Sequence, residues 1–184
     1  MRKLIFSLSL LILGSTSIKA QYVALNPGEV VSNISLISTN NTRYDFMAQK
    51  QAKGFIVVFM TPTCDHCRAY EKRVIALDKK YKAKGYPVVA IGPYGDYPDQ
   101  YPLDALPEMK KLAIKEGFTF PYLSDAQFKY TTLLGIKKTP TAIILVKKPN
   151  GLKIAYKGDI DNQMDIKKVP TRKFVEEEIN KLVK

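Results

Sequence analysis

The hydrophobic pattern along the chain alternates between short continuous apolar runs and longer segments with helical spacing. Two of the runs, residues 55–60 and 87–91, are rich in β-branched residues, which is typical of strands buried on both faces of a parallel sheet. Between them, residues 65–84 place apolar side chains at helical spacing, and Gly85 follows as a stop signal. This order predicts a strand–helix–strand unit.

The remaining pattern predicts further elements of the same layered fold. Strands are expected at residues 30–37, 42–46, 141–146 and 152–156, and helices at 104–116, 126–134 and 171–183. Together they predict an α/β fold with a central mixed sheet, flanking helices and an N-terminal β extension.

The first twenty residues differ from the rest of the chain. Arg2 and Lys3 precede an apolar run over residues 4–13, and small residues lead to Ala20, which is the pattern of a secretory signal. The run is shorter than the roughly 20 apolar residues that span a bilayer, so cleavage near Ala20 is favoured over an uncleaved anchor. We therefore expect residues 1–20 to be a signal peptide and residues 26–184 one domain, exported to the periplasm or secreted, without stable membrane insertion.

The formal net charge is +12. The lysines are spread along the chain in pairs rather than in one run, and export argues against nucleic acid as a partner. The charge is therefore interpreted as a solvated surface, with weak steering of acidic partners as the other interpretation.

Both cysteines of the chain, Cys64 and Cys67, and its only histidine, His66, lie within four residues. A structural zinc site needs four protein ligands and a catalytic one three, which this short cluster supplies poorly. Haem attachment would need histidine directly after the second cysteine, where Arg68 stands. A hydrolytic triad needs a histidine base beside a separate nucleophile. Dithiol chemistry remains, and we expect neither a metal nor another cofactor.

The motif Cys64-Asp65-His66-Cys67 lies where a buried strand passes into a helix. A helix amino terminus offers free N–H donors and a positive dipole end, which would stabilise a thiolate on Cys64. Cys67 lies one turn later, so we expect Cys64 to attack a disulfide and Cys67 to resolve the mixed disulfide. Protonated His66 would make the pair more oxidising and Asp65 would oppose this. A purely structural disulfide here would close too short a loop to stabilise much.

A segment rich in Tyr, Pro, Gly and Asp, residues 92–102, follows the second buried strand. Ligands gather at the carboxyl ends of parallel strands, so we expect this segment to lie beside the cysteines. Tyr94, Tyr97 and Tyr101 would form a substrate-contacting rim there or pack against the sheet edge, because tyrosine serves both purposes.

Residues 59–67 resemble the active-site strand and turn of thioredoxin-like redoxins, and Thr139-Pro140 before an apolar strand resembles their cis-proline element. Residues 120–136 and 156–161 resemble the peroxiredoxin-like branch, the alkyl hydroperoxide reductase/thiol-specific antioxidant group. This resemblance implies a thioredoxin fold, a cis Pro140 packed against the active-site pair, and a Thr139 backbone that pairs with an extended substrate segment. An ordinary trans proline opening an edge strand is the alternative.

Two positions depart from the family pattern. Val58 stands where thioredoxins carry a buried acid, so a proton carrier for Cys67 is left to Glu108, Asp96 or water. Peroxiredoxins carry a threonine where Thr61 stands, but Val57 replaces their proline, which counts against peroxidase activity.

Three functions follow from these residues. The first is thiol–disulfide exchange with protein substrates outside the cytoplasm, more as a reductant supplied by a membrane-bound electron donor. The second is a thiol peroxidase that uses Cys64. The third is a non-enzymatic metal-binding or chaperone role.

Overall fold

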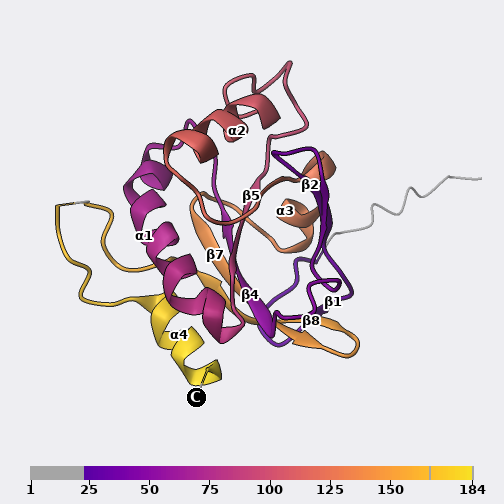
Figure 1. The fold of residues 1–184 in the computed structure, drawn as a ribbon, viewed down its shortest axis with the longest axis vertical. Coiled ribbons are helices and arrows are strands. Elements are labelled where there is room, and N and C mark those ends of the chain that lie inside the picture. The colour runs from indigo at the N-terminus through magenta and orange to yellow at the C-terminus, as the bar shows by residue number, and fades with distance from the viewer. Residues whose placement is uncertain (1–22, 166, 184) are drawn as a thin grey trace, which may run out of the picture.

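A computed structural model describes residues 23–165 and 167–183, and in this part of the chain eight strands form one mixed sheet (Figure 1). The strands lie in the order β1-β8-β7-β4-β5-β6-β2-β3. Their bounds are β1 Val30–Val31, β2 Ser35–Ser38, β3 Arg43–Asp45, β4 Gly54–Phe59, β5 Val88–Gly92, β6 Tyr122–Ser124, β7 Thr141–Lys148 and β8 Gly151–Gly158. The helices are α1 Asp65–Tyr81, α2 Leu106–Lys115, α3 Lys129–Leu133 and α4 Phe174–Leu182, with the 3₁₀ turns η1 Lys82–Lys84 and η2 Ala126–Phe128.

The central strand β4 is buried along its whole length. Because side chains of a strand alternate between faces, Ile56 and Val58 pack against α1, α2 and α4, whereas Val57 and Phe59 pack against α3 and the N-terminal strands. Figure 1 shows α1 and α4 together on one side of the sheet and α3 on the other. The predicted α/β architecture with flanking helices is confirmed.

Helix α1 carries the apolar face that the sequence predicts, with Val74, Leu77 and Tyr81 buried against the sheet. Its last turn tightens into η1, and Gly85 then adopts a φ of 89°, the left-handed conformation that glycine accepts at a helix end. The predicted stop at Gly85 is confirmed. Helix α2 is shorter than expected and begins after Ala105, which frees Asp104 for another contact.

The prediction of one strand over residues 30–37 is wrong. The segment forms β1, which pairs with β8 at one end of the sheet, and β2, which pairs with β6 and β3 at the other. Between them Ile34 is buried against the face that α3 covers. Apolar periodicity reports burial but not the sheet edge that a strand joins. The three-residue strand β6, which pairs with both β5 and β2, was not expected either.

Strand register brings two distant loops together at one edge of the sheet. β4 and β5 are parallel, so the loops after Phe59 and Gly92 leave from the same edge. β7 runs antiparallel to β4 and pairs Thr141 with Phe59, which places Thr139 and Pro140 opposite the turn that follows β4. That turn leads directly to the cysteines.

The predicted signal peptide, residues 1–20, lies outside the described residues. Within the described ranges, none of the helices combines the length and the apolar character needed to cross a bilayer.

Candidate active site

Cys64 is the N-cap residue of α1. Its backbone is extended, and its Sγ accepts a hydrogen bond from the backbone N–H of Cys67 at 3.1 Å. The side chain is half-buried and both cysteines are free thiols. A sulfur at this position receives a backbone donor and lies at the positive end of the helix dipole. The helix start that the sequence predicts is therefore present at Cys64.

Cys67 has a different environment, because its side chain is fully buried. Burial raises the pKa of the Cys67 thiol, and its hydrogen bond with Cys64 acts in the same direction. The backbone of Thr61 and the side chain of Thr139 act against this shift. One thiol is therefore accessible, while the other is shielded from solvent directly behind it.

The two inner residues of the motif point to solvent. The Asp65 carboxylate pairs with Arg68 one turn later, and its side chain is 80% exposed. His66 is also exposed and lines a cleft beside Thr139 and Pro140. The Arg68 guanidinium and the surrounding water therefore screen much of the negative charge of Asp65.

The Thr139–Pro140 peptide is cis, as the family resemblance implies. The Cys64 thiol donates to the Thr139 carbonyl oxygen at 3.4 Å. Two clefts flank Thr139: one of about 270 Å³ lined by His66 and Pro140, and one of about 230 Å³ lined by Tyr94 and Phe128. Cys64 thus lies beside a two-sided groove.

The tyrosine-rich segment reaches the cis-proline loop through Tyr94. Tyr94 lines the second cleft and stacks on Tyr101, with 4.2 Å between ring centroids. Tyr97 stacks on Phe128 at 4.7 Å and lines neither cleft that flanks Thr139. Of the three tyrosines, only Tyr94 is placed beside Thr139.

Asp104 anchors this segment to the active site, and sequence reasoning missed it. Its buried carboxylate accepts the Thr63 backbone N–H at 2.8 Å and the Thr63 hydroxyl at 2.7 Å. Thr63 directly precedes Cys64, so Asp104 fixes the turn that leads to Cys64. An acid at the start of an expected helix was the only available signal, and it is also the ordinary signal of a helix cap.

Both acids considered as proton carriers are engaged by other residues. The Asp96 carboxylate accepts the hydroxyl of Ser124, and Glu108 forms an ion pair with Lys111 at 2.6 Å. Tyr122 is completely buried, which raises the pKa of its hydroxyl, and the charges of Cys67 and Cys64 add to this effect. Its hydroxyl donates to the Met60 carbonyl oxygen at 2.8 Å.

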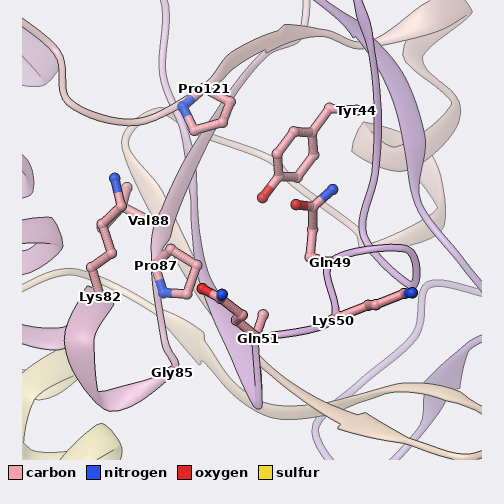
Figure 2. A pocket seen from close by; sticks show the side chains of 10 residues that line it. Tyr44, Gln49, Lys50, Gln51, Lys82, Gly85, Pro87, Val88 and Pro121 are labelled. Atoms are coloured by element: carbon pink, nitrogen blue, oxygen red, sulfur yellow. The ribbon is translucent and has the colours of Figure 1, made fainter.

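A separate hollow of about 470 Å³ lies at the other end of the sheet, where Pro87 leads into β5 (Figure 2). In this view the Tyr44 hydroxyl points toward Gln49. Burial and the nearby Asp78 raise the pKa of Tyr44 to about 12. The hollow holds no thiol and lies away from the cysteines. Across the described residues, no three His, Cys, Asp or Glu side chains are grouped to hold a metal ion.

A helix-capping thiol, a buried second thiol and a cis-proline loop on a mixed sheet define a thioredoxin-like redoxin. A match to a family model assigns the chain to one family within this class. The model of the AhpC/TSA family matches residues 27–163, well over half of the chain, and the chain belongs to that family.

Solved structures with the same fold include proteins named as thiol–disulfide oxidoreductases and one named as a peroxidoxin. A protein assigned as the thiol:disulfide interchange protein DsbE from Chlorobium tepidum is 20% identical, with a TM-score of 0.64 over 88% of this chain and 100% of the other. The thioredoxin domain of a thiol-disulfide oxidoreductase from Bacteroides vulgatus is 18% identical, with a TM-score of 0.61 over 88% and 100%. Peroxidoxin BcpB from Mycobacterium tuberculosis is 17% identical, with a TM-score of 0.60 over 76% and 88%. No curated protein sequence matches the chain closely enough to count as a relative.

Proposed function

We propose that this protein is an exported thiol–disulfide oxidoreductase that reduces disulfides in protein substrates through Cys64 and Cys67. The observation that carries the proposal is the unequal pair of thiols at the start of α1. Cys64 is half-buried and caps the helix, whereas Cys67 is fully buried one turn later. The first suits attack on a bulky disulfide and the second suits resolution within the protein.

In the proposed reaction, the Cys64 thiolate attacks a substrate disulfide and forms a mixed disulfide, and the first substrate sulfur leaves as a thiolate. Cys67 then attacks the Cys64 sulfur, which releases the second substrate thiolate and leaves a Cys64–Cys67 disulfide. Two electrons have passed to the substrate. A dithiol donor, proposed to be membrane-bound, returns the pair to the reduced form.

Protein substrates are favoured over small ones by the groove around Thr139. Clefts on both sides of this residue offer room for the side chains that precede and follow a substrate cysteine. An extended segment would pair with the Thr139 backbone as a short strand, a mode in which main-chain hydrogen bonds supply the affinity. Tyr94 would contact such a segment from one side and His66 from the other.

Export rests on the basic, apolar and small-residue pattern of residues 1–20. Mass spectrometry of the protein recovered outside the cytoplasm should give a mature chain that begins at Gln21. A chain that retains Met1 in the cytoplasmic fraction would contradict this part of the proposal.

Reduction of insulin by dithiothreitol tests the proposed activity. The wild-type protein should accelerate precipitation of the insulin chains, and Cys64→Ser should not. Cys67→Ser should accumulate a mixed disulfide with its substrate, because the resolving thiol is gone. Equal rates for wild type and Cys64→Ser would reject the function. A reduction potential of about −270 mV would support a role as a reductant, and a potential of about −120 mV would support a role as an oxidant.

Peroxidase activity is the second candidate, because Thr61 stands three residues before Cys64, as the threonine of peroxiredoxins does. A peroxide pulse separates the two functions. A peroxidase should turn over peroxide and carry sulfenic acid on Cys64, whereas an exchange protein should do neither at a comparable rate.

A further inference from the structure

Glu71 is a buried acid without a partner. Its side chain lies on α1 with only 6% of the residue exposed, and its Oε1 has no hydrogen-bond partner among the described residues. Buried carboxylates in folded proteins are normally paired or hydrogen-bonded, because desolvation disfavours the charge. A group left in this condition calls for an explanation other than packing.

The position of Glu71 relates it to the resolving cysteine. It follows Cys67 by four residues on α1, so the two side chains leave the same face of the helix one turn apart. Tyr122, on the neighbouring strand β6, is affected by the charges of both residues. Cys67, Tyr122 and Glu71 therefore share one buried region under the active site.

The charged groups around Glu71 come from two helices. Burial raises the pKa of Glu71, Glu116 at the end of α2 raises it further, and Lys115 and Arg68 lower it. Lys115 pairs with Glu116 at 3.2 Å, and Arg68 pairs with Asp65, so both cations are engaged elsewhere. In the described part of the chain, neither of these cations forms an ion pair with Glu71.

We propose that Glu71 takes up the proton that Cys67 loses during resolution of the mixed disulfide, an inference that rests on the proposed exchange function. As the Cys67 sulfur attacks Cys64, the S–S bond to the substrate breaks and the Cys64–Cys67 bond forms. The substrate sulfur leaves as a thiolate and takes a proton from solvent. The Cys67 proton passes through water to the Glu71 carboxylate and later to bulk solvent. Glu71 does not touch the reacting sulfurs and acts on Cys67 through water. It is therefore a positioning residue and not a catalytic one.

The reaction of the reduced protein with 5,5′-dithiobis(2-nitrobenzoate) tests this role, because it separates the two thiols in time. Attack by Cys64 releases the first coloured thiolate, and resolution by Cys67 releases the second. In Glu71→Gln the first phase should keep its rate, and the second should slow by roughly tenfold near neutral pH. This factor is smaller than the factors usually lost when a group that transfers a proton directly is removed. The pH profile of the second phase should also lose the inflection that the carboxyl contributes.

Two further variants separate proton transfer from packing. Glu71→Asp keeps an acid in the region and should recover part of the second-phase rate. Glu178→Gln, which removes the partner of Lys181 on helix α4, should behave as wild type. An unchanged second phase in Glu71→Gln, or a Glu71→Asp variant as slow as Glu71→Gln, would overturn the inference. A first phase that is absent in the wild type would instead reject the proposed function.

A measurement on the wild type keeps the inference testable if Glu71→Gln does not fold. Carbon NMR of glutamate-labelled protein should show the Glu71 carboxyl titrating at higher pH in the reduced form than in the disulfide form, because the reduced pair carries thiolate charge. Identical titration curves in the two forms would overturn the inference.

Discussion

At the scale of single residues, the site is defined by how each sulfur is solvated. Cys64 receives a backbone N–H and donates to the Thr139 carbonyl oxygen, whereas Cys67 is buried and interacts with Cys64, Thr61 and Thr139. The difference follows from their places on one helix, since a capping residue is open to solvent and a residue one turn later faces the core. Asp104 makes this arrangement depend on a second loop, because it holds the residue before Cys64.

The Asp104 contact leads to a prediction about stability and rate. Asp104→Ala removes two hydrogen bonds to Thr63, each contributing about 1 kcal/mol, so the free energy of unfolding should fall by about 2 kcal/mol. The turn before Cys64 would also loosen, and insulin reduction should slow. Urea denaturation and the insulin assay measure the two effects. Asp99→Ala, an exposed acid in the same segment, is the control, and equal stability of the two variants would contradict the assigned role.

At the scale of elements, a strand could be predicted from the sequence where its apolar run was long. The runs that became β4 and β5 were predicted because each is continuous and is buried on both faces. The segment over residues 30–37 was mispredicted because its apolar residues serve two edges of the sheet, and no local pattern encodes a change of partner. Strand β6 is too short for its periodicity to stand out from the helix that follows.

The packing of β4 against its neighbours gives a prediction for Gly54. A Cβ atom built there would lie 2.1 Å from the Leu145 carbonyl oxygen and 2.6 Å from the Tyr86 ring. Since neither the paired backbone nor the buried ring can easily move, Gly54→Ala should lower the free energy of unfolding by about 3 kcal/mol or more.

Gly92→Ala is the matched control for this prediction. Its Cβ would lie 2.7 Å from the terminal methyl of Met109, a flexible side chain that can change rotamer. We expect a smaller loss, about 1 kcal/mol, in the same urea titration. A Gly54→Ala protein as stable as Gly92→Ala would show that β4 and β7 adjust to one another more freely than their register suggests.

At the scale of the whole molecule, the sequence identified the two candidate thiols but not the residues packed around them. Cys64 and Cys67 can be recognised from the sequence because they form one short motif at the start of a predicted helix. Asp104 meets Thr63 across 41 residues, and Tyr122 meets Met60 across 62, so only the assembled sheet brings them together. Glu71 was missed for another reason: a charged residue within a helix is normally interpreted as part of its solvated face.

Burial of Glu71 should also govern how stability changes with pH. An unpaired buried carboxylate destabilises the folded state, and its pKa in the folded protein is raised by burial. The protonated acid therefore favours folding, so its contribution is fully present below the unfolded pKa of about 4.3 and is lost as pH rises through the folded pKa. Glu71→Met, which has neither charge nor an unsatisfied oxygen, should be more stable than wild type at pH 7 by about 1–3 kcal/mol.

That gain should shrink as the solution is acidified toward about pH 3, where the wild-type carboxyl is protonated in both states. Urea titrations of both proteins across this range provide the measurement, with Glu178→Met on α4 as the control for an ordinary surface acid. A gain that did not depend on pH would assign the effect to packing alone. A gain that follows the titration, together with slower resolution by Cys67, would mean that the molecule gives up stability to keep an ionisable group beneath its active site.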